Sequence, residues 1–229
     1  MKKSFFLILI FFSFFPFAFT QNFYRISGDF SIKGKTENSA QLIMGRFYYD
    51  KNEKVIVNVN TFPEKAIWVT SDTNLYKVID NKIASRQTIP NFTPFSMYHM
   101  VLNNQLNNFG LDESIFTLDN VESEKGLVIT TWIPPKSMKN IAGKIMISTK
   151  DDNLFGIIFF NSEGIIIKKQ FFEDYIISNG LAFPGKITEI TYPSDGKEIY
   201  QVTTYKNVVV NDHHDENFYH FSVSDYQQY

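Results

Sequence analysis

The feature that most constrains this chain is a repeated alternation of apolar and polar side chains over short segments. β-Branched and aromatic residues alternate with polar ones, and clusters of Asn, Asp, Gly and Pro separate the segments. A period of two residues is typical of strands that bury one face of an antiparallel sheet. The segments are 30–35, 41–49, 54–59, 66–70, 126–133, 143–148, 154–160, 164–172, 186–192 and 198–205. We expect a mainly β protein of about a dozen strands, as a large curved sheet, a barrel or a sandwich.

One stretch, 93–110, predicts a helix. Thr93 can supply the N-cap oxygen, Pro94 suits the first helical position, and Gly110 ends the pattern. The apolar face is wide, which fits either a helix packed on a core or a pliable lid over an apolar cavity, since Met side chains repack around varied partners. In the lid interpretation Met97 and Met100, three residues apart, share a face that looks onto the cavity beside Val101.

The first twenty residues predict a secretion signal. Lys2 and Lys3 give a positive start, 5–19 is apolar apart from Ser13, and small side chains precede a cleavage site near Thr20. The apolar run is shorter than the ~20 residues that a membrane helix needs. We therefore expect 1–20 to be a signal peptide and 21–229 to form one exported domain without a membrane anchor.

The composition of the chain excludes several classes of chemistry and of binding partner. The sequence contains no cysteine, so disulfides, thiol nucleophiles and an N-terminal lipid attachment are excluded. Without Lys2 and Lys3 the formal charge moves from −2 to −4, which argues against nucleic acid or anionic lipid as an electrostatic partner. Aromatic residues make up 17% of the chain, which calls for a large apolar interior or a ligand surface.

A series of short motifs runs in a fixed order along the middle of the chain. They are GRFYYD at 45–50, FPEKAIWVTSD at 62–72, LYKV at 75–78, TPFSM at 93–97, LVI at 127–129, PPK at 134–136, FFNSEG at 159–164 and KQF at 169–171. In this order they resemble the LolA family of lipoprotein carriers. The resemblance implies a single large antiparallel curved sheet, a half-open barrel covered by one or a few helices, which holds the acyl chains of lipoproteins in an apolar cavity.

The resemblance also implies a periplasmic monomer without cofactor, metal or catalytic group. Its partners would be acylated lipoproteins or other lipids, with transient inner-membrane donor and outer-membrane acceptor proteins. The resemblance also implies which residues line the acyl cavity, with the helix as its lid. By position they are Phe47, Tyr49, Val57, Ile67, Val69, Phe95, Met97, Met100 and Val101.

The sequence departs from the family pattern in three places. In the family an Arg-Pro pair commonly follows the strand that contains Gly45, and its arginine helps to hold the lid shut. In this sequence Lys51 and Asn52 occupy those positions. The family's N-terminal helix has little room before the first strand. The segment 181–229 is closer to the broader lipoprotein-sorting relatives than to the carrier itself.

Two alternatives remain open. The first is a non-catalytic structural or interaction domain of the cell envelope with a filled interior, which cavity volume distinguishes from a carrier. The second is a metal-dependent or hydrolytic enzyme that uses His213, His214 and His220. Neighbouring strand residues point to opposite faces, which makes a shared ion difficult and favours a solvated loop. The enzyme alternative requires the three imidazoles to converge on one ion.

Overall fold

The computed structural model describes residues 22–36, 39–71, 73–91 and 93–228. The expected signal peptide, 1–20, lies outside the described residues, so cleavage near Thr20 stays a prediction. In the described ranges no helix is both long and apolar enough to cross a membrane.

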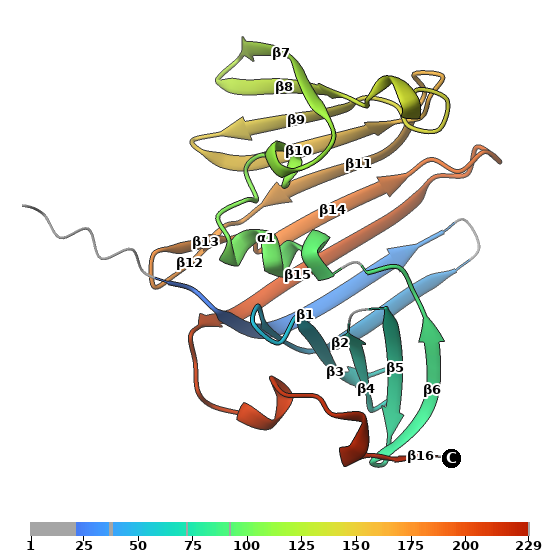
Figure 1. The fold of residues 1–229 in the computed structure, drawn as a ribbon, viewed down its shortest axis with the longest axis vertical. Helices are drawn as coiled ribbons and strands as arrows, with labels where there is room; N and C mark the ends of the chain where they lie inside the picture. The colour runs from blue at the N-terminus through green and yellow to red at the C-terminus, as the bar shows by residue number, and fades with distance from the viewer. Residues whose placement is uncertain (1–21, 37–38, 72, 92, 229) are drawn as a thin grey trace, which may run out of the picture.

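One curved sheet dominates the molecule (Figure 1). Its strands are β1 Arg25–Lys35, β2 Ala40–Asp50, β3 Val55–Phe62, β4 Ala66–Ser71, β5 Asn74–Ile79, β6 Lys82–Thr88, β7 Thr117–Glu124, β8 Leu127–Ile133, β9 Ile145–Lys150, β10 Asn153–Phe160, β11 Ile166–Glu173, β14 Lys186–Thr191, β15 Ile199–Val210 and β16 Gln227–Gln228. A separate hairpin joins β12 Ile176–Ser178 and β13 Leu181–Phe183.

The sheet is open. Its fourteen strands follow the order β16-β6-β5-β4-β3-β2-β1-β15-β14-β11-β10-β9-β8-β7, so β7 and β16 form its two ends. Neighbours are antiparallel, apart from β16, which runs parallel to β6. The expected fold class is therefore confirmed: the protein is mainly β, with one large curved sheet that does not close into a barrel.

Each of the ten segments expected from alternation contains a strand, but none of them covers β5, β6, β7, β12, β13 or β16. β7 shows why, because all eight of its side chains are exposed at the end of the sheet. An edge strand that buries neither face has no apolar period to detect.

The helix begins later and ends earlier than the sequence predicts. Thr93–Phe95 forms a 3-10 turn, and Ser96 caps the true helix α1, Met97–Leu102, by accepting a hydrogen bond from the His99 amide at 3.2 Å. The expectation that Thr93 is the N-cap is wrong. Ser96 serves better because it lies in extended backbone directly before the helix.

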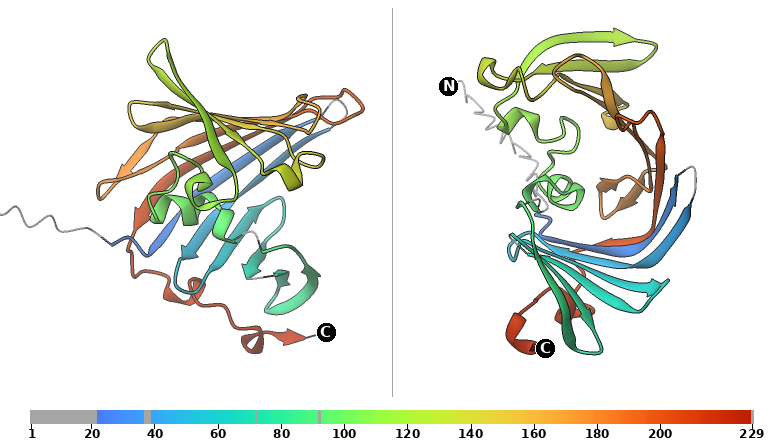
Figure 2. Two further views of the ribbon diagram at one scale, coloured as in Figure 1. Left: turned by 45° about the horizontal axis from the view of Figure 1, so that its top comes forward. Right: turned by 90° about the vertical axis from the view of Figure 1, so that its right-hand side faces the viewer.

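The remaining helical turns are short 3-10 segments, and α1 is the one α-helix in the described part of the chain. The turns are η2 Leu111–Glu113, η3 Lys136–Met138, η4 Glu216–Phe218 and η5 Val223–Asp225. Figure 2 shows α1 inside the curve of the sheet and the C-terminal segment, 211–228, outside it.

Two apolar clusters follow from this arrangement. The concave cluster lies between the sheet and α1, and its members include Ile26, Phe30, Phe47, Tyr49, Met100, Val101, Leu102, Trp132, Ile157, Phe172, Phe183 and Tyr205. The convex cluster lies between β2–β5 and the C-terminal segment. Its buried members are Tyr48, Val55, Val57, Val69, Tyr76 and Tyr219.

An ion pair fixes the C-terminal segment beneath the convex face. Arg25 and Asp50 are both buried and lie 3.1 Å apart, and Glu216 meets the other guanidinium nitrogen at 2.6 Å. The Arg25 guanidinium also lies 4.5 Å from the Tyr219 ring centre. Breaking such a buried pair leaves an uncompensated charge, so the segment belongs to the fold rather than hanging from it.

Candidate functional site

An apolar pocket opens on the concave face, between the sheet and α1. Its volume is about 350 Å³. The lining consists of aromatic and aliphatic side chains with two amides: Phe30, Ile32, Ile43, Asn58, Asn60, Trp68, Tyr98 and Tyr205. A concave, mostly apolar hollow with a few polar groups is the usual form of a small-molecule site.

The strand register explains why space remains there. Asn60 on β3 pairs with Gly45 on β2 and with Ala66 on β4, so small side chains surround it. Gly45 also pairs with Phe30 on β1. A side chain at Gly45 would collide with the carbonyl oxygen of Val59, because β2 and β3 shift register there. The sheet thus leaves a gap where three strands carry little bulk.

A cluster of aromatic rings closes one end of this pocket. The Tyr98 ring of α1 stacks on Phe47, with centroids 4.5 Å apart, and Tyr205 meets Phe47 edge to face at 5.5 Å. Phe183 packs against Tyr205 at 5.2 Å. Burial raises the pKa of Tyr98, and burial also raises that of Tyr205 to about 12, so both phenols stay neutral at physiological pH.

The residues that the family resemblance nominates for the lining are divided between two faces. Five belong to the concave side: Phe47, Tyr49, Met100 and Val101 are buried in the concave cluster, and Met97 packs against it. Three, Val57, Ile67 and Val69, belong to the convex cluster or pack on it. Phe95 precedes α1 and is 71% exposed.

The division follows directly from strand pairing. Asn58 pairs with Phe47 and Trp68, so these three side chains share the concave face. Val57 pairs with Val69, and both therefore point the other way. The valines of β3 do form a buried face, but the C-terminal segment covers it.

The pocket residues that sequence reasoning missed carried a usable signal. Asn58 and Asn60 alternate with the valines of β3, which made them candidates for a face in contact with water. They are half-buried and line the pocket instead. A hairpin that pairs Asn58 with Trp68 across the 61–65 turn places the tryptophan beside them, although a tryptophan in a strand by itself most often indicates core packing.

The histidines do not assemble a metal site. His213 and His220 both approach Glu216, at 2.9 Å and 3.6 Å, whereas His214 pairs with Asp212 at 2.6 Å. Among the residues that the structure describes, no group of three or more His, Cys, Asp or Glu side chains could hold a metal ion. The convergence that the enzyme alternative requires does not occur there.

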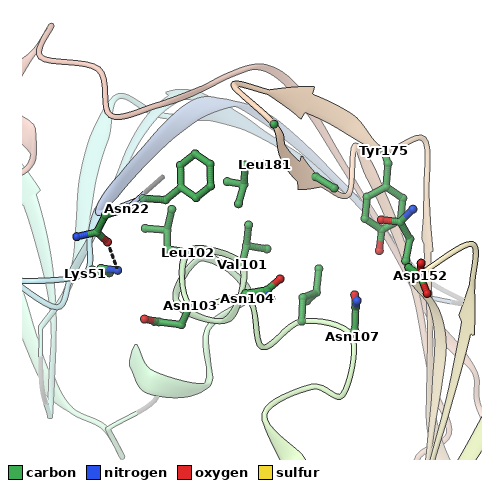
Figure 3. A pocket seen from close by; sticks show the side chains of 15 residues that line it. Asn22, Lys51, Val101, Leu102, Asn103, Asn104, Asn107, Asp152, Tyr175 and Leu181 are labelled. Atoms are coloured by element: carbon green, nitrogen blue, oxygen red, sulfur yellow. Dashed lines mark hydrogen bonds between the residues drawn. The ribbon is translucent and has the colours of Figure 1, made fainter. Parts of the chain in front are cut away.

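A second cavity, of about 590 Å³, lies at the other end of α1 (Figure 3). Tyr98 borders the apolar pocket, whereas Val101 and Leu102, one turn later, border this cavity. Its rim is rich in asparagine, in contrast to the apolar pocket.

Comparisons with known proteins concern the fold. No family model and no curated protein matches the chain. Solved structures do match. A LolA superfamily protein from Nitrosomonas europaea aligns over 88% of this chain and 92% of its own, with a TM-score of 0.54 and 12% identity. The chain has the LolA-like fold.

Two further structures agree with this assignment. A DUF1329 family protein from Desulfovibrio piger covers 90% of this chain and 92% of its own, at a TM-score of 0.60 and 14% identity. A domain from Vibrio parahaemolyticus, described as an outer membrane lipoprotein-sorting protein, covers 85% of this chain and 88% of its own. Its TM-score is 0.55 and its sequence identity is 10%. At these identities the likeness establishes architecture and leaves activity to the site itself.

Proposed function

We propose that this protein is a carrier of the cell envelope that binds the acyl chains of lipoproteins or other lipids in the apolar pocket. The observation that carries the proposal is the unfilled hollow beneath α1, lined by Ile32, Ile43 and Trp68. Each buried methylene of a chain would contribute about 0.8 kcal/mol, and the two amides allow the open end to stay in contact with water.

The LolA-like fold supports the same class of function, since one structural neighbour is described as an outer membrane lipoprotein-sorting protein. We propose that the mature chain works in the periplasm as a non-catalytic monomer, takes its cargo from an inner-membrane donor and passes it to an outer-membrane acceptor. Phe47 supports the pocket through Tyr98. Val57, Ile67 and Val69 stabilise the sheet from its convex side.

The alternative with a filled interior also has an observation in its favour. The rings of Phe47, Tyr98, Phe183 and Tyr205 occupy the middle of the concave face. If the protein is only structural, these rings are its core and the pocket beside them takes no ligand.

Two adjacent residues of β2 separate these alternatives. Ile43 lines the pocket and is half-buried, whereas Met44 points to the convex side and is 43% exposed. Ile43→Asp places a charge in the pocket and should weaken binding of a dansyl-labelled undecanoic acid by more than about tenfold. Met44→Asp is the matched control and should stay within about twofold.

Energy transfer from tryptophan to the dansyl group measures the binding, because Trp68 lines the pocket. Circular dichroism checks that both variants fold. Equal affinity of the folded Ile43→Asp variant and the wild type would exclude this pocket as the acyl site. No binding by the wild type would favour the structural alternative.

A further inference from the structure

The second cavity is assembled from five separate parts of the chain (Figure 3). The N-terminal end supplies Asn22 and Phe23, the turn after β2 supplies Lys51, and the end of α1 with its following loop supplies 101–107. The β9–β10 turn and the 175–182 region complete the wall. Loops that converge on one hollow from distant positions provide many differently oriented groups, which is how specific sites are usually built.

The polar part of the wall is formed mostly by amides. Five asparagines line the cavity: Asn22, Asn103, Asn104, Asn107 and Asn153. An asparagine side chain both donates and accepts hydrogen bonds. Lys51 is the one cation and Asp152 the one carboxylate of the lining, so their formal charges cancel.

Several of these amides are available to a ligand. Within the described residues the side chains of Asn104 and Asn107 have no hydrogen-bond partner in the protein, and Figure 3 shows both at the edge of the hollow. Asn103 and Asn153 use only their NH₂ groups, on the carbonyls of His99 and Asp151, which leaves their side-chain oxygens free to accept. Leu106, which lies between Asn104 and Asn107 in sequence, is buried and holds the loop after α1 in place.

The floor of the cavity is apolar. Val101, Leu102, Leu106 and Leu181 are buried there, and the rings of Phe23 and Tyr175 are half-buried beside them. The Tyr175 hydroxyl donates to the Leu154 carbonyl at 2.6 Å, which fixes the ring against the wall. A ligand must therefore match an apolar surface and a ring of neutral amides at once.

We propose that this cavity binds a neutral, hydroxyl-rich group, that is, a sugar. A pyranose ring presents C–H groups on its faces, which fit the leucines and the Tyr175 ring, and hydroxyls around its edge, which pair with donors and acceptors alike. An acyl chain would desolvate the amides without replacing their hydrogen bonds. A phosphate would meet a single lysine that already donates to Asn22 at 3.1 Å, together with the carboxylate of Asp152.

The test uses maltose and the mature protein. Saturation-transfer NMR should detect maltose at millimolar concentrations, and glycerol phosphate, a smaller hydroxyl-bearing anion, should show no transfer. The double variant Asn104→Gly, Asn107→Ala should weaken maltose binding roughly tenfold, because two direct hydrogen bonds are lost. Glycine is chosen because Asn104 has a φ of 56°, which glycine adopts without strain.

Asn120→Ala provides the matched control, since Asn120 is an exposed amide on β7, the last strand of the sheet, and does not line the cavity. It should bind maltose as the wild type does. Absence of transfer to maltose in the wild type, or an unchanged affinity in the folded double variant, would overturn the proposal.

The sugar cavity shares no lining residue with the proposed acyl pocket, and the Ile43→Asp variant shows whether one ligand uses both. Maltose binding should persist in that variant even if acyl binding is lost. Dodecyl maltoside, below its micelle concentration, should bind more tightly than maltose if the source is a glycolipid headgroup, and Ile43→Asp should remove that gain. Equal affinities identify a free glycan as the source.

Discussion

The two faces of strands β2–β4 differ in how completely the rest of the chain covers them. On the convex face Val57 and Val69 lie beneath Tyr219, which is 1% exposed. On the concave face Asn58 and Asn60, which alternate with Val57 and Val59 along β3, border an unfilled pocket. One face is completed by the chain's own C-terminal segment, and the other is left open.

The two covers are also attached differently. The C-terminal segment is held by the Arg25 ion pairs and by a hydrogen bond from Tyr48 to Asp215 at 2.9 Å, and its end adds β16 to the sheet. Helix α1 is short and joins β2 through a hydrogen bond between the Tyr49 hydroxyl and His99 at 2.7 Å, together with ring stacking. The convex cover is thus built into the fold, and the concave cover has fewer polar ties to the sheet.

The largest effect is expected from Tyr219→Ala. Removing a fully buried aromatic side chain typically costs about 3 to 5 kcal/mol of unfolding free energy, and the Tyr219 ring packs edge to face on Tyr48 at 5.4 Å. Urea unfolding measures the loss. Acyl binding by the folded protein should be unchanged, because the residue lies on the face away from the pocket.

Ile177→Ala is the control for this change. Ile177 is 67% exposed, and its truncation should alter stability by less than about 0.5 kcal/mol. A Tyr219→Ala variant as stable as this control would show that the C-terminal segment is not the structural cover that the packing indicates.

A smaller effect is expected when the open face is made to resemble the filled one. Asn60→Phe would place a ring over Gly45 and Ala66, where the strands carry little bulk. Stability should stay constant or rise by about 1 kcal/mol from added apolar contact, while affinity for the dansyl-labelled acid should fall at least about fivefold. Thermal unfolding and the fluorescence titration measure the two quantities.

Asn120→Phe on the exposed edge strand is the matched control and should leave the affinity unchanged. If Asn60→Phe binds the labelled acid as tightly as the wild type, the acyl chain does not occupy the space above Gly45.

The smallest effect concerns pH and the attachment of α1. Burial, with the nearby Lys54 and Lys51, lowers the pKa of His99, so the folded state favours the neutral ring that can accept from Tyr49. Because the unfolded pKa is about 6.5, the unfolded chain takes up this proton first, and stability falls as pH drops below that value. His99→Gln should flatten this part of the stability profile, and the change is small because the ring is only half-buried.

His214 gives the opposite sign and serves as the control. Its hydrogen bond with Asp212 raises its pKa, so its contribution is present at low pH and is lost as pH rises through the folded pKa. His214→Gln should therefore leave the decline below about pH 6.5 in place. An unaltered profile in His99→Gln would mean that α1 is not held by the neutral imidazole.

Much of the secondary structure could be predicted from the sequence, because alternation survives wherever one face of a strand is buried. The β3 segment illustrates this, since Val55, Val57 and Val59 mark it clearly. β7 could not be found by the same rule, because both of its faces are exposed. The helix lies within the expected stretch, 93–110, but both of its ends differ from the expectation, since it is capped by Ser96 instead of Thr93 and ends at Leu102 instead of before Gly110. Both Thr93 and Ser96 offer a hydroxyl, and only the packed backbone selects between them.

The sequence by itself determined ten of the strands, the single helical stretch and, where a strand buries one face, its division into an apolar and a polar side. Only the tertiary structure decided which side faces inward. A period of two residues separates two faces but gives neither of them a direction. That direction depends on the C-terminal segment, whose Tyr219 lies more than a hundred residues from Val57 and covers the face that the valines form. The pocket consequently lies on the side of Asn58 and Asn60, where the neighbouring strands β2 and β4 place only Gly45 and Ala66 opposite Asn60.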